Sequence, residues 1–402
     1  MPERTEILIV GGGLVGASLA IALDAAGRDA VLVEAAAPRV DAQPSYDERN
    51  LALSRASVNG LRALGVWPHA EAQATPIRRV HVSRAGEFGA TRLAAEEFGV
   101  DALGFTLPAR ELGRALLARL EACTRLLRHA PAALVELAPH ADGWRARLRT
   151  PEGERELFAR LVVGADGTES FVCARLGIEA EVHDYAQTLF VATVTPERAP
   201  DGGAWERFAD EGPVALLPLA QDRAGLVLTV PAADGERVAA LDDEAFLALA
   251  QARFGWRLGR LARPGKRHPY RIRRVAAAAL TAPRAVLVGN AAQTIHPIGA
   301  QGFNLGLRDA LTLAELAAGA ADPGDAALLR AYAARRAEDR DGTMAMSHGL
   351  VGLACLAEPA LAPLRSLALV ACDRVPPLKR ALARRGMGFR GTPPRAVLEP
   401  AG

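Results

Sequence analysis

The sequence is poor in cysteine and in net charge, and each shortage argues against a class of protein. Its four cysteines lie far apart, without a CxxC pair or a nearby histidine tract, and they are Cys123, Cys173, Cys355 and Cys372. We therefore expect neither a disulfide framework nor a metal site, and a reducing cytosol suits the chain. The 48 basic and 46 acidic residues leave a net charge of +2. Nucleic-acid binding, which needs a concentrated basic surface, is not indicated.

The sequence also lacks a hydrophobic run long enough to cross a membrane comfortably. The uncharged apolar run from Ile7 to Leu23 has 17 residues, whereas a spanning helix needs about 20, and it is rich in glycine. Only Glu3 and Arg4 precede it as charges, and no small-residue cleavage motif clearly ends it. We therefore expect a cytoplasmic protein without a secretion signal.

The sequence does have enough apolar material for a large core. Half of its 402 residues are hydrophobic and 23% are charged, with 38 glycines and 26 prolines. Such a chain is neither disordered nor collagen-like. Its length corresponds to about two or three domain-sized units, or to one large interleaved fold.

The first 34 residues contain a pattern typical of dinucleotide binding. The apolar run Glu6–Val10 predicts a strand buried on both faces, Ala17–Ala26 predicts a helix, and Val31–Val33 predicts a second strand. A G-x-G-x-x-G sequence separates the first strand from the helix, and Glu34 closes the second strand. This is the order of elements that the dinucleotide-binding fingerprint requires.

Each glycine of the fingerprint has a separate task in this interpretation. Gly11 permits the tight turn, Gly13 lets the backbone approach a pyrophosphate, and Gly16 allows close packing of the helix on the strand. Glu34 can accept hydrogen bonds from both hydroxyls of an adenosine ribose and would repel a 2′-phosphate, which favours FAD or NAD over NADP. The alternative is a glycine-rich turn that binds no ligand.

Two later segments repeat the strand-to-glycine pattern. The strand in Leu161–Gly167 runs into a glycine-acid-glycine turn, and the strand in Ala285–Ala292 leads through His296–Asn304 into a helix that we expect to begin near Leu305. Each segment places small and polar residues at the carboxyl end of a strand, where open α/β sheets bind ligands. Taken singly, each could be an ordinary loop.

Together, the three segments resemble the class A flavoprotein aromatic hydroxylases, the family of para-hydroxybenzoate hydroxylase. Residues 47–53, 289–297 and 301–309 are similar to its ubiquinone-biosynthesis branch. The resemblance covers about residues 5–350, although 180–275 offers little to match. It implies an α/β fold in which a Rossmann-like FAD-binding domain with a parallel sheet interleaves with a substrate domain built on a mixed or antiparallel sheet.

The resemblance implies that a set of positions binds FAD. In chain order these positions are Gly11, Gly13, Gly16, Glu34, Arg49, Arg110, Val135, Asp166, Asn290, Gly302, Phe303 and Asn304. Within this set, the resemblance implies that Arg49 contacts the phosphates, that Val135 lies beside adenine, and that Asp166 belongs to a fingerprint associated with both FAD and the nicotinamide.

The last four of these positions, with Pro297, surround the flavin in the family. Asn290 stands where most of the family has an aspartate near the ribityl chain, a departure that the ubiquinone branch shares. Gly302, Phe303 and Asn304 are implied to give backbone contacts to the isoalloxazine ring, and Pro297 to line its substrate side.

Several of these residues also fit simpler roles. Arg49 or Arg110 taken alone is typical of a solvated or ion-paired surface residue. Asp166 between two glycines is typical of a turn. His296 before Pro297 is more typical of a packed histidine than of an acid/base catalyst.

The resemblance also implies the chemistry. NAD(P)H, docking transiently, reduces FAD, oxygen adds at the flavin C4a position, and the resulting hydroperoxide hydroxylates a phenol. The sequence shows no Ser-His-Asp arrangement, no G-x-S-x-G motif and no general base that we can name. The cofactor therefore carries the difficult step, and the protein orients the ring and excludes water.

The domain limits follow from the positions of the motifs. We expect FAD-binding segments at 1–75, 100–180 and 276–345, a substrate domain at 76–99 and 181–275, and a helical C-terminal segment at 346–402. Strands such as Val214–Leu219 and Gly225–Val230 would build the sheet that covers the flavin.

The C-terminal segment is basic and partly apolar. Residues 374–395 carry seven arginines and lysines, and Leu378, Ala381 and Leu382 recur at helical spacing. This pattern fits a helix resting on an anionic membrane, on the inner face of a bilayer, or a helix bound to a partner protein, such as a ubiquinone-biosynthesis complex. The alternative is a solvated terminal helix packed on the core.

The function that we expect is hydroxylation of a polyprenylated phenol in ubiquinone biosynthesis, with FAD as cofactor and O2 as co-substrate. Three alternatives stay open at this point. They are a hydroxylase of another ring position or another lipophilic aromatic, a flavin-dependent polyprenyl reductase, and a scaffold subunit without activity.

Overall fold

The computed structural model describes residues 3–37, 39, 41, 43–45, 47, 49–354 and 358–398. Cys355 and Glu48 lie outside the described residues. The helices are α1 (Leu14–Ala25), α2 (Arg55–Ala63), α3 (Ala109–Glu121), α4 (Phe171–Arg175), α5 (Gly235–Ala239), α6 (Asp243–Phe254), α7 (Gln301–Ala318), α8 (Ala326–Ala354), α9 (Ala362–Arg374) and α10 (Pro376–Gly386).

The strands form three sheets. Their bounds are β1 (Glu3–Val10), β2 (Ala30–Val33), β3 (Asn50–Ser54), β4 (Thr75–Ile77), β5 (Arg79–Arg84), β6 (Ala90–Ala94), β7 (Gly104–Pro108), β8 (Leu126–His129), β9 (Ala133–His140), β10 (Gly143–Thr150), β11 (Gly153–Gly164), β12 (Ala180–Pro196), β13 (Gly203–Phe208), β14 (Val214–Pro218), β15 (Ala224–Pro231), β16 (Leu261–Ala262), β17 (His268–Ala277), β18 (Thr281–Ala282), β19 (Ala285–Leu287) and β20 (Gln293–Thr294).

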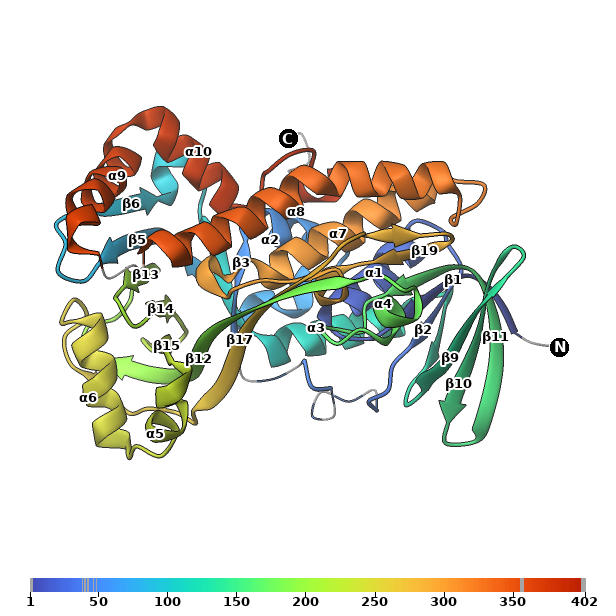
Figure 1. The fold of residues 1–402 in the computed structure, drawn as a ribbon, viewed down its shortest axis with the longest axis horizontal. Coiled ribbons are helices and arrows are strands. Elements are labelled where there is room, and N and C mark those ends of the chain that lie inside the picture. Colours follow the sequence, from blue (N-terminus) through green and yellow to red (C-terminus); the bar gives the residue numbers. More distant parts are fainter. Residues whose placement is uncertain are drawn as a thin grey trace.

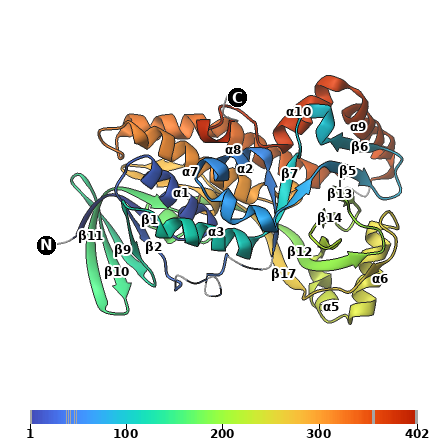
Figure 2. The ribbon, with the colours of Figure 1, turned by 180° about the vertical axis from the view of Figure 1, so that it is seen from behind.

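The first sheet has a parallel core. Its strand order is β18-β19-β11-β1-β2-β8, and β1, β2, β8, β11 and β19 pair in parallel. Ile7, Leu8 and Ile9 are fully buried, as expected for a central strand that is covered on both faces. Helix α1 packs against α7 and α3, and Figure 2 shows α3 from the side opposite to that of Figure 1.

The second sheet is mixed. Its order is β20-β17-β12-β15-β14-β13-β5-β6, and all of these pairs are antiparallel except β13 with β5. The long strands β12 and β17 run from the first sheet to the other end of the molecule (Figure 1). A small third sheet joins β3, β7 and β4. This α/β architecture confirms the predicted fold class.

The C-terminal segment is helical, as predicted. Helix α8 lies along α7, and α9 and α10 cover β5 and β6 at the far end (Figure 1). Part of the apolar stripe of α10 is used inside the fold, because Leu382 and Ala383 pack with Leu93 and Leu103. Within the described residues, no helix combines the length and apolar character needed to cross a bilayer.

One predicted boundary is wrong by a full helical turn. Helix α7 begins at Gln301, not near Leu305. Gly299 (φ 65°) and Ala300 (φ 51°) both adopt left-handed backbone angles that turn the chain directly into the helix. The helix N-terminus therefore includes the residues that the sequence assigned to the loop.

Candidate active site

The structure brings the three glycine segments together at one edge of the parallel sheet. Val10 is the register partner of Gly164, and Gly164 is the partner of Leu287. The three strands thus end side by side, and the turns that follow them share one surface. Ligands of open α/β sheets bind at this position.

Two glycines of the first turn are required by the polypeptide itself. Gly11 has φ 102°, and a Cβ atom there would lie 2.5 Å from the carbonyl oxygen of Ala165. A Cβ atom on Gly16 would lie 1.8 Å from the carbonyl oxygen of Gly11. These glycines let the turn, α1 and β11 pack closely.

Two other glycines are not required by the polypeptide. Gly13 has an ordinary extended backbone, and a Cβ atom there would meet only the Ser45 side chain, at 3.1 Å. A Cβ atom on Gly302 would have nothing within 4 Å. Among the described residues nothing explains why these positions lack side chains, so the open space at both suits the close approach of a bound group such as the pyrophosphate and ring of FAD.

Glu34 lies at the end of β2 and faces the glycine turn. Its carboxylate accepts hydrogen bonds from the backbone N–H groups of Gly12 (2.5 Å) and Ala36 (2.7 Å). These bonds hold the carboxylate beside the turn while leaving lone pairs on both oxygens. The position suits the predicted contact with ribose hydroxyls.

Two backbone hydrogen bonds join the segments that contain Arg49 and Arg110. The N–H of Ala109 donates to the Arg49 carbonyl oxygen (2.8 Å), and the N–H of Arg110 donates to that of Asp47 (3.0 Å). The Arg49 side chain pairs with Asp47 at 2.6 Å and lies 5.3 Å from the Tyr270 ring centre. Phosphate binding by Arg49 would therefore compete with an existing ion pair.

Val135 follows a segment that bonds to β2, since the N–H of Ala132 donates to the Glu34 carbonyl oxygen (2.7 Å). A small hollow beside Gly12 and Glu34 is lined by Arg128 and Ala130, which come shortly before Val135 in the chain. Val135 lies on β9 and is not among the residues that line this hollow. The structure thus does not join Val135 to Glu34 in one hollow.

The Asp166 carboxylate binds groups of the loop that follows it. It accepts hydrogen bonds from the Ser170 hydroxyl (2.5 Å) and the Val172 N–H (3.0 Å), which lie at the start of α4. Burial raises its pKa, and these hydrogen bonds oppose the shift. The side chain thus holds the start of α4, which fits the turn-forming alternative, and its part in binding FAD or nicotinamide stays a prediction. Asn290 after β19 is exposed.

The N-terminus of α7 faces the same surface. Its N-cap residue, Ala300, has no side-chain acceptor, so the first N–H groups, on Gln301, Gly302 and Phe303, receive no cap from it. Asn304 is buried, and its amide bonds to the Ala300 carbonyl and to the β3 backbone, each at 2.8 Å. An uncapped helix N-terminus favours electron-rich ligand atoms, which suits the predicted ring contacts.

A buried charge network behind this helix was missed by the sequence analysis. Asp309 accepts from the Gly289 N–H (3.1 Å), the Gln293 amide (2.7 Å) and Arg336 (2.6 Å). Asp339 of α8 pairs with Arg308 and Arg336, and the side chains of all four charged residues are at most 2% exposed. The network fixes the Gly289 turn to α7 and α8, but its partners are separated in sequence and only the fold joins them.

A cavity of about 570 Å³ begins at the loop before α7 and extends under the C-terminal helices. Pro297, Ile298 and Gln301 lie at one end, and α9 and α10 contribute the other. Most of its lining side chains are aliphatic or aromatic. Its volume lies in the range of about 300–1,000 Å³ that is usual for small-molecule sites.

His296 is buried beside this cavity and belongs to the packing of the loop. The Ile298 N–H donates to its Nδ1 (3.2 Å), so its Nε2 carries the proton and faces Gln187 Oε1 (3.1 Å). Burial lowers the pKa of His296 to about 4. A neutral imidazole with a hydrogen bond at each ring nitrogen fits the packed histidine that the sequence favoured.

Glu206 is an ionisable residue of the cavity that the sequence analysis did not single out. Burial raises the pKa of its carboxyl to about 7, and the backbone N–H of Gly299 opposes that shift. The only sequence signal was an acidic residue between Ala204 and Phe208 in a short apolar strand. That pattern is equally typical of a strand with one solvated face.

Comparison with known proteins places the chain among flavin enzymes. Residues 4–345 match the FAD binding domain family. The ubiquinone hydroxylase UbiL of Rhodospirillum rubrum is 36% identical over 387 residues, covering 95% of this chain and 89% of that protein. The 3-demethoxyubiquinol 3-hydroxylase of Escherichia coli is 33% identical over 398 residues, covering 96% of this chain and 99% of that protein.

A solved structure shares the fold. The p-nitrophenol 4-monooxygenase PnpA from Pseudomonas putida DLL-E4 matches with a TM-score of 0.80 and 18% sequence identity, covering 97% of this chain and 99% of that one. At this identity the likeness shows the fold alone.

Proposed function

The chain belongs to the FAD binding domain family and is an FAD-dependent monooxygenase, and we propose that it hydroxylates a polyprenylated phenol in ubiquinone biosynthesis. NAD(P)H is the proposed reductant and O2 the co-substrate. When bound, FAD supplies the electron transfer and oxygen activation that side chains cannot perform. Both relatives described above carry names of ubiquinone-pathway hydroxylases.

The cavity is the observation that carries this proposal. Pro297 and Gln301 at one end lie beside the start of α7, where the flavin ring is proposed to bind. Its opposite end is lined by leucines of α9 and α10, including Leu364, Leu369 and Leu382. A phenol at the flavin end can extend its hydrocarbon chain along this wall, which gains about 25 cal/mol for each Å² of apolar surface buried.

The predicted domain limits remain part of this proposal. Strands of 181–275 share one sheet with β5 and β6 from 76–99, joined through the pairing of β13 with β5, while β1, β2, β11 and β19 share the other large sheet. This pairing supports FAD-binding segments that interleave with the substrate domain.

An oxygenation assay tests the proposed function. Purified protein loaded with FAD is given NADH or NADPH, air and a panel of geranyl-substituted phenols. We expect oxygen-dependent NAD(P)H oxidation coupled to a product heavier by one oxygen atom. Oxygen-independent reduction of a prenyl double bond would support the reductase instead. A protein that forms no product and binds no FAD would support the scaffold.

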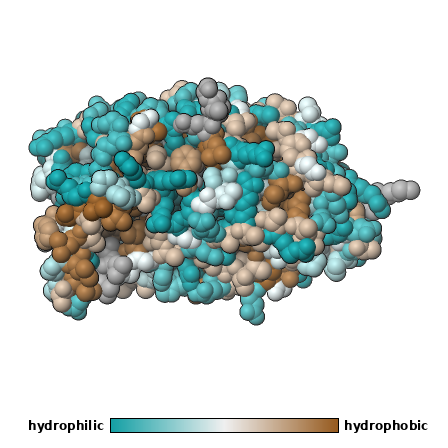
Figure 3. Space-filling view, turned by 90° about the horizontal axis from the view of Figure 1, so that it is seen from above, coloured by the Kyte–Doolittle hydropathy of each residue, from teal (hydrophilic) through white to brown (hydrophobic). Residues whose placement is uncertain are grey.

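We further propose that α9 and α10 rest on an anionic membrane surface. Leu364 and Leu367 of α9 are 65% and 58% exposed, and Leu364 also lines the cavity. Exposed arginines of α10, including Arg380 and Arg384, lie nearby along the chain. Figure 3 shows apolar residues gathered at the end of the molecule that these helices cover. Clustered cations beside exposed apolar side chains suit an anionic lipid surface.

Substitution of the exposed leucines tests this contact. Because α10 packs into the fold, deleting it would disturb the protein, so we choose Leu364→Glu with Leu367→Glu. We expect sedimentation with phosphatidylglycerol-containing liposomes to fall at least about tenfold, since each leucine loses about 1.5–3 kcal/mol of burial. Leu127→Glu, at a 48% exposed leucine on β8, is the control and should bind normally. Equal binding of both variants would contradict the proposed contact.

A further inference from the structure

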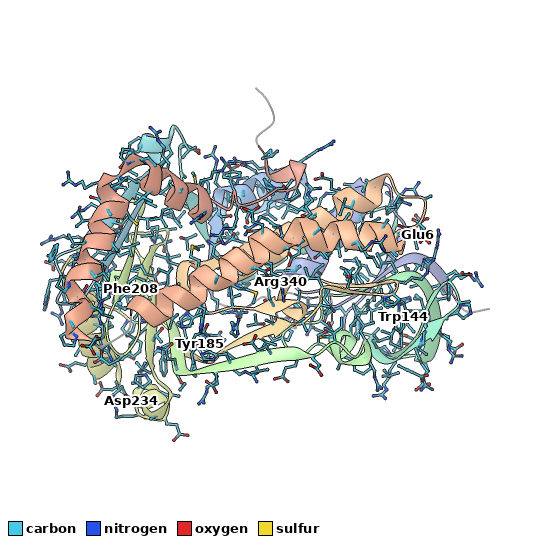
Figure 4. All side chains as sticks on the ribbon, turned by 45° about the horizontal axis from the view of Figure 1, so that its top comes forward. Glu6, Trp144, Tyr185, Phe208, Asp234 and Arg340 are labelled. Carbon is cyan, nitrogen blue, oxygen red and sulfur yellow. The ribbon has the colours of Figure 1, made fainter. Side chains whose placement is uncertain are left out.

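The wall of the cavity contains one carboxylate among the described residues that line it. That residue is Glu206, in the middle of β13. Ala204, Glu206 and Phe208 alternate along this strand and all line the cavity. Figure 4 shows Phe208 on the sheet that the C-terminal helices cover.

The neighbours of Glu206 in the sheet are apolar. Its register partners are Val82 on β5 and Ala215 on β14, and Ala215 pairs in turn with Val227 on β15. All three line the cavity too. Glu206 is half-buried, and it lines the cavity among these apolar side chains, where burial raises the pKa of its carboxyl group.

The other ionisable groups of the cavity do not neutralise this carboxylate. Arg84 on β5 pairs with Asp210 and Glu87, and Arg365 on α9 pairs with Glu87. His296 is neutral, and burial raises the pKa of the Cys372 thiol on α9. No cation of the described residues forms an ion pair with Glu206. β6, β14, β15 and α10 contribute no ionisable group to the lining.

Glu206 also lies close to the flavin end of the cavity. The backbone N–H of Gly299 interacts with its carboxyl group, and Gly299 follows Pro297 by two residues in the loop that leads into α7. A phenol bound beside Pro297 would therefore lie near this carboxylate.

We propose that Glu206 accepts the phenolic proton of the substrate and so prepares the ring for hydroxylation. This inference rests on the proposed function, and it assigns the general base that the sequence analysis could not name. The O–H bond of the phenol breaks, its electron pair stays on the phenolate oxygen, and an O–H bond forms on the carboxylate. The transfer needs no oxidant or reductant, and it makes the ring electron-rich where oxygen is inserted.

Glu206→Gln separates this role from a purely structural one. Glutamine keeps the size of the side chain and an oxygen acceptor for the Gly299 N–H, but it cannot take up a proton. With the geranyl-substituted phenol that the wild type converts fastest, we expect at least about a hundredfold slower hydroxylation, the usual contribution of a general base. Reduction of FAD by NAD(P)H should stay near wild type, so consumed NAD(P)H should yield hydrogen peroxide in place of product.

The pH profile is the second readout. The carboxylate form is the base, so wild-type hydroxylation should rise with pH through a midpoint near 7, the raised pKa of Glu206. The Gln variant should lose this step, and Glu206→Asp should retain it at a lower rate. Glu211→Gln, an exposed glutamate paired with Arg253, is the matched control and should behave as wild type.

The outcomes distinguish the two proposals. A wild-type enzyme that hydroxylates, with a Gln variant of equal rate and equal pH profile, would overturn the role of Glu206 and leave the proposed function standing. A wild-type enzyme that binds FAD but hydroxylates no phenol of the panel would overturn both.

Discussion

Gly13→Val is expected to give a folded but colourless protein. Gly13 has an extended backbone that valine adopts readily, and its Cβ atom would meet only the movable Ser45 side chain. The fold should therefore survive, and the new methyl groups should occupy the space proposed for the pyrophosphate. Overpacking a built site costs about 1–3 kcal/mol, which weakens FAD binding roughly 5- to 150-fold. Absorbance of the purified protein and titration with FAD measure the loss.

Two other glycines control for the substitution itself. Gly319→Val follows α7, where a Cβ atom has nothing within 4 Å, so this variant should stay yellow. Gly16→Val would place Cβ 1.8 Å from the Gly11 carbonyl oxygen and should prevent correct folding. A Gly13→Val protein with wild-type flavin content would disprove the pyrophosphate site at this turn.

Asp339→Ala is expected to cause a large loss of stability. The Asp339 carboxylate accepts from Arg308 Nε (2.6 Å) and Arg336 Nη2 (2.8 Å), and all three side chains are at most 2% exposed. Its removal leaves two buried guanidinium groups with too few acceptors. Breaking a buried ion pair in this way costs about 3–5 kcal/mol, which the free energy of unfolding in urea should show.

Asp341→Ala is the matched control, two residues further along α8. The Asp341 side chain is 69% exposed and pairs with Arg340 at 3.5 Å, so its loss should cost no more than about 1 kcal/mol. Equal destabilisation by the two variants would show that the network stabilises the fold no more than a surface pair.

The network also predicts how stability depends on acid. Burial alone would raise the pKa of Asp339, but Arg308 and Arg336 outweigh burial and hold it below its ordinary value of 3.8. The folded state therefore binds this proton less readily than the unfolded state does. The stabilisation should be complete above about pH 4 and should disappear as the pH falls through the lowered pKa. The difference in stability between wild type and Asp339→Ala should shrink accordingly.

The glycine turns could be predicted from sequence because their causes are local. Gly11 provides the positive φ of the turn and Gly16 meets the Gly11 carbonyl oxygen, both within one strand-turn-helix unit, and the apolar runs beside them indicate strands by composition alone. The close approach of Gly11 to Ala165 after β11 is a tertiary contact that the sequence did not show. The start of α7 was predicted four residues too late. The left-handed backbone angles of Gly299 and Ala300 turn the chain into the helix early, and a glycine and an alanine in a loop do not by themselves indicate such angles.

The candidate site was only partly predictable for the same reason. Asp166 appeared in a motif, and the sequence did not show that its carboxylate also bonds to Ser170 and Val172. Glu206 belonged to no motif, since its importance depends on the apolar neighbours that three other strands supply.

The sequence by itself determined that this protein has an α/β fold, a dinucleotide-binding turn and membership of an FAD-dependent hydroxylase family, because each of the motifs that indicate them is a short run of neighbouring residues. Tertiary structure alone decided that the strand ends of β1, β11 and β19 meet, that Asp309 and Asp339 share a buried network, and that Glu206 faces an apolar cavity. The physical reason is that burial and pairing of a charge depend on distant segments, and only the folded chain brings them into contact.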